Sequence, residues 1–148
     1  MDQITWHENY ALGFPEIDDD HRGLINIINE IIKALADRDF NLCVSFSETF
    51  VSALKEHYPR EEEFLEEIGY THLKEHAGYH RKMLEQAEEF VELCKKEKNV
   101  ELLEERLKRL VAKLLEDTRG GDLYFRTELL EKGLDKALSD RPIISMWL

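Results

Sequence analysis

The sequence has little cysteine, proline and glycine, and it has no long apolar segment. There are 2 cysteines, 3 prolines and 7 glycines among 148 residues. Cys43 and Cys94 are far apart in the chain and form no C-x-x-C pattern, so we expect two small core residues, with neither a disulfide framework nor a thiolate zinc site. No segment reaches the roughly 20 apolar residues of a transmembrane helix. We therefore expect no membrane partner.

Basic side chains are also in short supply. The 20 Lys and Arg residues face 32 Asp and Glu residues, which gives a net charge of −12. Binding to phosphates or to an anionic lipid surface needs a basic patch, so nucleic acid is not an expected partner.

The first ten residues, MDQITWHENY, lack the basic and apolar regions of a signal peptide. We expect a cytoplasmic protein, either a monomer or a small homo-oligomer.

What the sequence does contain is helix-forming residues in long stretches between short turns. Hydrophobic residues make up 43% of the chain and charged residues 35%. This predicts one all-α domain over residues 1–148, an up-and-down antiparallel four-helix bundle with an N-terminal arm. The expected parts are an arm over 1–17, a bundle over 18–138 and a tail over 139–148. The tail, RPIISMWL, is apolar enough to pack on the bundle or on another chain.

Helix ends follow from capping residues and glycines. Asp18 is the expected N-cap of the first helix, with Asp20 in its first turn, and Thr71 is the expected cap of the third. Gly69 ends the second helix. The expected helices cover 18–37, 42–68, 71–98 and 100–138, the last of them interrupted at Gly120–Gly121.

Polar residues interrupt the apolar core positions on all four helices. Steps of three and four residues predict which side chains face the core. In chain order these are His21, Leu24, Ile28, Ile31 and Leu35; Phe50, Leu54, His57, Glu61, Phe64 and Ile68; Leu73, His76, His80, Met83, Ala87 and Phe90; Leu103, Leu107, Leu110, Leu114, Asp117, Gly121 and Tyr124. A buried polar group without a partner costs about 1–3 kcal/mol, so these histidines and carboxylates must satisfy one another.

Sharing a cation is the simplest way to satisfy them. The pairs His57/Glu61 and His76/His80 are each spaced i, i+4, so each presents two donor groups to one point between the helices. Imidazole and carboxylate together suit iron, zinc or manganese. There are more candidate ligands than one ion needs, which favours two metal ions over one.

The sequence resembles the hemerythrin family, in particular its single-domain bacterial members. WHENYALG at residues 6–13 is similar to the family's W-x-x-x-Y-x-x-G arm, and IDDDH at 17–21 matches I-D-x-x-H. HYPREE at 57–62 matches H-x-x-x-E, and HAGYH at 76–80 matches H-x-x-x-H. The family's fourth-helix pattern, W-L-x-x-H-x-x-x-x-D, aligns with KLLEDTRGGD at 113–122.

The resemblance implies two non-haem iron ions bridged by two carboxylates and an oxo or hydroxo group, with manganese or zinc less expected. One iron would be held by His21 and His57 and would keep an open position for dioxygen. The other would be held by His76, His80 and a histidine of the fourth helix. Glu61 and Asp122 would be the bridging carboxylates.

The match breaks at Asp117, which stands where the family has that fourth-helix histidine. Asp117 either ligates the metal, where its charge favours ferric over ferrous iron, or pairs with Lys113 and leaves the metal. Gly120 and Gly121 would permit a bulge or bend between Asp117 and Asp122, or would end the helix.

Other polar residues near these motifs are not expected to bind metal. His72 is predicted to lie in the first turn of the third helix, either at the surface or beside a ligand, and His7 is predicted to lie in solvent. The acids Glu62, Glu63, Glu66 and Glu67 are expected to form a solvated face.

Three functions remain open from the sequence. The leading hypothesis is a di-iron protein that binds dioxygen or a related small ligand, for storage, delivery, scavenging or sensing. A di-iron oxidase or peroxidase is the enzyme alternative, and a metal-free helical interaction module is the third. Tests of turnover and of metal content separate them.

Overall fold

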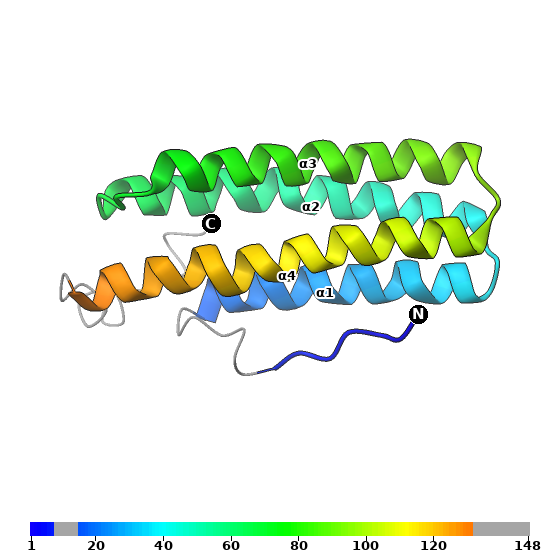
Figure 1. Ribbon diagram of the computed structural model, residues 1–148, viewed down its shortest axis with the longest axis horizontal. Coiled ribbons are helices and arrows are strands. Elements are labelled where there is room, and N and C mark those ends of the chain that lie inside the picture. The colour runs from blue at the N-terminus through cyan, green and yellow to red at the C-terminus, as the bar shows by residue number, and fades with distance from the viewer. Residues whose placement is uncertain (8–14, 132–148) are drawn as a thin grey trace.

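The computed structural model describes residues 1–7 and 15–131, with side chains described for 1–7 and 17–115. Four helices follow in order: α1 (Pro15–Ala36), α2 (Phe40–Glu67), α3 (Leu73–Lys96) and α4 (Val100–Glu131). The described residues contain no strand. The helices run alternately up and down, and the neighbouring pairs α1/α2, α2/α3, α3/α4 and α4/α1 are in contact (Figure 1). The predicted all-α four-helix bundle is confirmed.

Short turns with specific caps join the helices. The Asp39 side chain accepts a hydrogen bond from the Leu42 backbone N–H at 3.1 Å, so α2 begins at Phe40, two residues earlier than predicted. Asn99 plays the same part for α4, accepting from the Leu102 N–H at 3.2 Å. Gly69, with φ of +68°, follows α2 and has the left-handed conformation that glycine adopts without strain.

Three predicted features of the helix ends are wrong. Helix α1 begins at Pro15, a residue that fits the first turn because no N–H is needed there, so Asp18 is a buried residue inside the helix and not its N-cap. The N-cap of α3 is His72 and not Thr71, and the Leu73 N–H bonds to the Tyr70 carbonyl at 3.3 Å. Helix α4 continues through Gly120 and Gly121 without the predicted interruption. Two glycines cost only about 1 kcal/mol each, which a helix of this length tolerates.

The core positions predicted from periodicity are buried, with two exceptions among the described side chains. Ile68 and Leu73 are only half-buried, because they lie at helix ends beside the turn between α2 and α3. The predicted positions from Asp117 onward and the tail over 139–148 lie outside the described side chains. The confirmed apolar positions are Leu24, Ile28, Ile31, Leu35, Phe50, Leu54, Phe64, Met83, Ala87, Phe90, Leu103, Leu107, Leu110 and Leu114.

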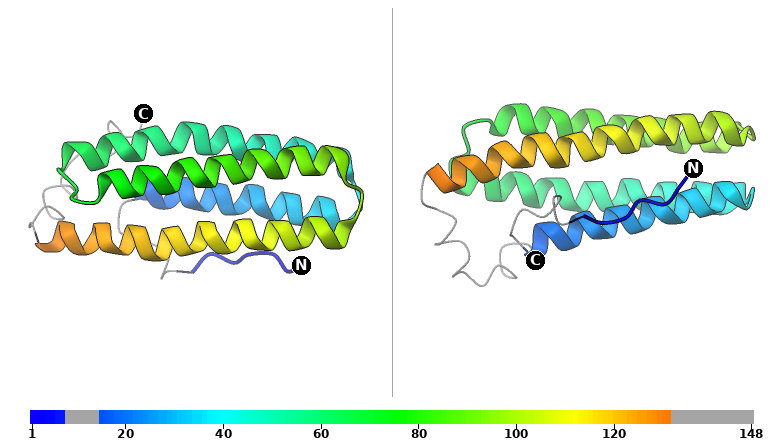
Figure 2. Two further views of the ribbon diagram at one scale, coloured as in Figure 1. Left: turned by 45° about the horizontal axis from the view of Figure 1, so that its top comes forward. Right: turned by 60° about the horizontal axis from the view of Figure 1, so that its bottom comes forward.

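The described part of the N-terminal arm, residues 1–7, lies along the bundle (Figure 2). The Asn29 side chain pairs with the backbone of Ile4 twice, accepting from its N–H at 2.7 Å and donating to its carbonyl at 2.9 Å. Two residues further along the arm, the Arg22 guanidinium lies 4.6 Å from the centre of the Trp6 ring. The arm therefore runs antiparallel to α1, towards the end of the bundle where α1 begins.

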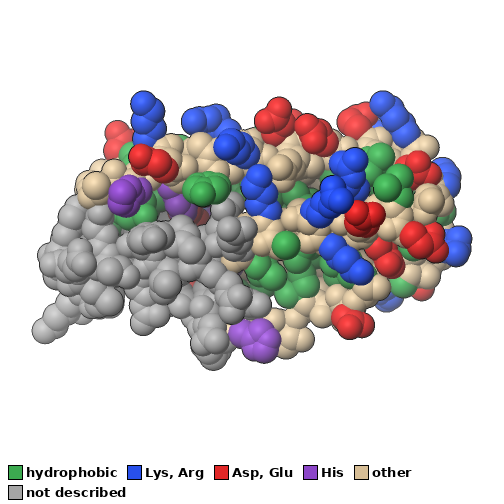
Figure 3. All heavy atoms as spheres, viewed as in Figure 1, with side chains coloured by type: hydrophobic (Ala, Val, Ile, Leu, Met, Phe, Trp, Pro, Cys, Tyr) green, Lys and Arg blue, Asp and Glu red, His purple; other side chains and the backbone are tan. Residues whose placement is uncertain are grey.

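Charged side chains cover the outer faces of the helices. Among the described residues on the face drawn in Figure 3, acidic and basic side chains are interspersed and form no single basic patch. Among the described helices, none has a stretch long and apolar enough to span a bilayer.

Candidate metal centre

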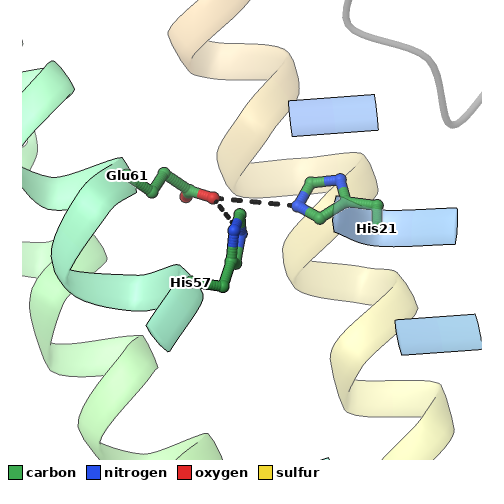
Figure 4. Close-up of side chains that lie close together, drawn as sticks. All are labelled: His21, His57 and Glu61. Atoms are coloured by element: carbon green, nitrogen blue, oxygen red, sulfur yellow. Dashed lines mark ion pairs between the residues drawn. The ribbon is translucent and has the colours of Figure 1, made fainter. Parts of the chain in front are cut away.

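Glu61 is the centre of a buried polar layer made of His21, His57, Glu61, His76 and His80. Its Oε2 atom lies 2.7 Å from His57 Nε2 and 3.7 Å from His21 Nε2. Figure 4 shows these two rings, from α2 and α1, pointing at the same carboxylate oxygen.

The second oxygen of Glu61 faces the other two histidines. Glu61 Oε1 is in close contact with His76 Nε2 and lies 3.3 Å from His80 Nε2. One carboxylate thus divides the four imidazoles into two pairs, one pair on each oxygen. This is the arrangement that a carboxylate bridging two ions requires.

Helix geometry explains why the pairs form. His57 and Glu61 on α2, and His76 and His80 on α3, are each separated by one helical turn, so their side chains emerge on the same face. The ring centres of His76 and His80 are 4.4 Å apart, and those of His21 and His57 are 5.1 Å apart.

Two groups of side chains are close enough to hold metal ions, and they share Glu61. In each group the candidate ligand atoms lie within 4.8 Å of one another: His21, His57 and Glu61 in one, and Glu61, His76 and His80 in the other. Each group offers two imidazole nitrogens and one carboxylate oxygen. The ligand residues predicted on the first three helices are therefore brought together.

The electrostatics of the layer favour a cation. Burial alone would raise the pKa of Glu61, but the surrounding imidazoles, His57 foremost, hold it well below its ordinary value. Burial likewise would lower the pKa of His57, but Glu61 and Asp20 outweigh this effect and raise it to about 9. The carboxylates thus attract positive charge into the layer, as a proton on His57 or as a metal ion.

Two carboxylates outside the layer orient its histidines, and the sequence motifs indicated this role for neither of them. Asp20 Oδ2 lies 2.7 Å from His57 Nδ1, and Glu62 Oε2 lies 3.0 Å from His80 Nδ1. A ring that donates its Nδ1–H to a carboxylate keeps its Nε2 lone pair for the interior, where Glu61 lies.

The sequence predicts Asp20 as an acid of the first helical turn and Glu62 as part of a solvated face. Both are only half-buried. The available signal was their position in the sequence, since each directly adjoins a ligand candidate, His21 or Glu61. Burial also raises the pKa of Asp20, but its bonds to His57 outweigh that effect and lower it.

Aromatic rings hold two of the histidines in place. The Tyr58 ring stacks on the His80 ring with centres 3.8 Å apart and planes 6° apart. The Tyr70 ring meets the His76 ring edge-on at 6.3 Å. These contacts restrict ring rotation on α3, so the nitrogen atoms stay directed at Glu61.

Removing the orienting carboxylates should weaken metal binding without abolishing it. We expect Asp20→Ala and Glu62→Ala each to lower metal affinity by about 10–100-fold, because the ring then loses the partner that fixes its tautomer and orientation. Competition with a chelator measures the change, and the exposed Glu63→Ala is the matched control. Affinity equal to that of the control would show that the outer carboxylates do not tune the ligands.

The two fourth-helix candidates are placed only by their backbone. Helices α3 and α4 are antiparallel and joined by residues 97–99, so residues equally far from this turn lie at the same height. Asp117 lies seventeen residues after Val100, and His80 lies seventeen residues before Glu97. The backbone of Asp117 is therefore at about the same height in the bundle as that of His80. The side chains of Asp117 and Asp122 lie outside the described set, so their ligation stays a prediction.

The remaining two histidines lie outside the polar layer. His72, at the N-cap of α3, is exposed, and so is His7 in the arm. Their assignment to the surface is confirmed, although His72 precedes the first turn of α3 instead of lying within it. Of the three histidines within residues 72–80, only His76 and His80 therefore belong to the polar layer.

Comparison with known protein families agrees with this geometry. The family model for the hemerythrin HHE cation-binding domain matches residues 12–120. The matched segment contains the whole polar layer and Asp117, and it ends two residues before Asp122. A comparison with curated proteins gave no match.

Proposed function

This chain belongs to the hemerythrin HHE cation-binding family, and from that premise we propose that it is a di-iron protein that binds dioxygen or a related small ligand. The observation that carries the proposal is the geometry at Glu61, because each of its two carboxylate oxygens faces a different pair of imidazoles. Two ions placed on these groups would share one carboxylate at the centre of the bundle.

The chemistry of the donor atoms supports iron over the alternatives. Each group supplies two histidines and one carboxylate, a set typical of non-haem ferrous iron with positions left for small ligands. A closed structural zinc site uses four protein ligands, commonly with thiolates. Both cysteines are about 20 Å further along their helices, because each lies fourteen residues from the nearest ligand candidate on its helix.

The residues of the polar layer have distinct roles in this proposal. His21 and His57 would hold one ion, His76 and His80 would hold the other, and Glu61 would supply a carboxylate oxygen to each. Asp20 and Glu62 bind Nδ1 of His57 and His80, which directs Nε2 of each ring towards the position of an ion. The apolar side chains around the layer exclude bulk water, so a small uncharged molecule is the ligand best suited to reach it. Two ferrous ions, when bound, supply the electrons that dioxygen accepts.

An optical titration tests the proposal. Protein loaded anaerobically with ferrous iron is expected to take up about two ions per chain, and admitting air should produce a new charge-transfer band in the near ultraviolet and visible. The Glu63→Gln protein should behave identically, since that side chain is exposed. Full iron loading with no optical change in air would overturn oxygen binding.

Asp117 is expected to shorten the lifetime of the oxygen complex. A carboxylate in place of a neutral imidazole favours ferric iron, because its charge stabilises the more highly charged ion at short range. The Asp117→His variant should therefore retain its air-induced band at least about tenfold longer than the natural protein, by time-resolved absorbance. The control is Glu105→His, at an exposed position on the same helix. If the band of the Asp117→His variant decays as fast as that of the natural protein, Asp117 lies outside the coordination sphere, as a partner of Lys113.

A di-iron oxidase or peroxidase is the second candidate, and the same Asp117 favours it. Carboxylate-rich iron centres suit oxidation better than reversible carriage because the ferric state is stabilised. Multiple turnovers of peroxide, nitric oxide or ferrous iron per centre would support an enzyme. Oxidation that stops after one equivalent would leave the binding function.

A further inference from the structure

The two cysteines meet in the bundle core, which their separation in the sequence did not indicate. Cys43 on α2 and Cys94 on α3 are both fully buried, and their sulfur atoms are 3.4 Å apart. Both are free thiols. A disulfide needs a sulfur separation of about 2.0 Å, so the two atoms must approach by roughly 1.4 Å, which small side-chain rotations can supply.

The hydrogen bonding of the pair makes the two thiols unequal. The contact with Cys94, the largest influence, lowers the pKa of the Cys43 thiol, while the same contact raises the pKa of Cys94 above its usual value. The Ser47 hydroxyl donates to the Cys43 carbonyl at 2.6 Å and lies 3.9 Å from the Cys94 sulfur. Cys43 also lies near the N-terminus of α2 and Cys94 near the C-terminus of α3, so the helix dipoles favour a thiolate at Cys43, which makes Cys43 the better nucleophile.

The position of the pair in its helices gives a route for small reagents. Cys43 lies just after the first turn of α2, where its N–H bonds to the Asp39 carbonyl at 3.0 Å, and Cys94 lies in the last turn of α3, which ends at Lys96. Terminal turns open at much lower free-energy cost than helix centres. A small neutral oxidant can therefore reach thiols that are covered in the closed structure.

We propose that Cys43 and Cys94 form a redox modification site that a hydroperoxide converts into a disulfide between α2 and α3. The Cys43 thiolate attacks the peroxide oxygen, the O–O bond breaks, and Cys43 becomes a sulfenic acid while the first water (or alcohol) leaves. The Cys94 sulfur then attacks the Cys43 sulfur, an S–S bond forms, and the hydroxyl leaves as water with the Cys94 proton. The two thiols lose two electrons and two protons, and the peroxide is reduced by the same two electrons.

Disulfide formation should stabilise the end of the bundle remote from the metal centre. The bond would close a loop over residues 43–94, which restricts the unfolded chain far more than the folded one. A rise in melting temperature of about 10 °C is expected for a loop and domain of this size.

Peroxide treatment followed by mass spectrometry tests the site. One equivalent of hydrogen peroxide should lower the intact mass by two hydrogen atoms and remove both thiols from maleimide titration in denaturant. Proteolysis should yield one peptide pair that links Cys43 to Cys94, and dithiothreitol should restore both thiols. Retention of both thiols under conditions that oxidise free glutathione would overturn the proposal. So would a gain of oxygen atoms on either cysteine in place of the link.

Matched variants separate this site from the metal centre. Cys43→Ala and Cys94→Ala should each lose the temperature rise after peroxide treatment, and a rise retained in either would overturn the proposal. The Glu61→Gln protein should form the disulfide as readily as the natural protein, since the centre is about 20 Å away. Disulfide formation that requires Glu61 would also overturn the proposal, whereas failed oxygen binding alone would overturn only the proposed function.

Discussion

Replacing Glu61 with glutamine is expected to remove both of the proposed metal ions at once. The substitution preserves the size of the side chain but takes away the charge that four imidazoles surround. Because each oxygen of Glu61 belongs to a different group of ligand atoms, neither group keeps its carboxylate. The loss of affinity should exceed the about 100-fold effect of an outer carboxylate. Metal analysis after dialysis should find about two ions per chain in the natural protein and close to none in the variant.

The control for this result is Glu63→Gln, an exposed position two residues further along α2. It changes the net charge by the same amount and should leave the metal content unchanged. Circular dichroism should find the same helix content in both variants. A Glu61→Gln protein that retains one ion per chain would contradict a shared carboxylate and would assign Glu61 to one ion only.

The bundle and the inward-facing positions of the polar layer on its first three helices followed from the sequence because local rules govern them. Periodicity determines which residues face inward, and the i, i+4 spacing of His57 with Glu61 and of His76 with His80 holds on any helix that carries them. Helix ends were less predictable. Thr71 and Asp18 have good capping chemistry, but backbone bonds and the proline at position 15 determined the actual ends.

Contacts between helices were the part that the sequence did not reveal. The bond between Asp20 and His57 joins α1 to α2, and that between Glu62 and His80 joins α2 to α3. The contact between Cys43 and Cys94 depends on the same α2/α3 register. To predict any of these three contacts, one must know which turn of one helix lies beside which turn of the next. Sequence periodicity shows which face of a helix is buried, but it does not show how far one helix is shifted along its neighbour.

Metal loading is expected to stabilise the whole bundle, because the ligands come from different helices. His21 belongs to α1, His57 and Glu61 to α2, and His76 and His80 to α3, so unfolding must release the ions. A ligand present at 1,000 times its dissociation constant stabilises the folded state by about 4 kcal/mol. For a chain of this length that corresponds to a rise in melting temperature of about 10 °C for each ion, measured under anaerobic conditions with ferrous iron.

Substitutions in the polar layer should show how this rise in melting temperature divides between the two ions. His21→Ala and His80→Ala each remove one imidazole from one group, so each should lower the rise to about half that of the natural protein. Glu61→Gln should abolish it. An equal rise in all three variants would mean that iron stabilises the chain from elsewhere, and a complete loss in both single-histidine variants would mean that neither ion binds without the other. The second outcome would keep the centre but make it a single cooperative unit, as a carboxylate shared between two ions permits.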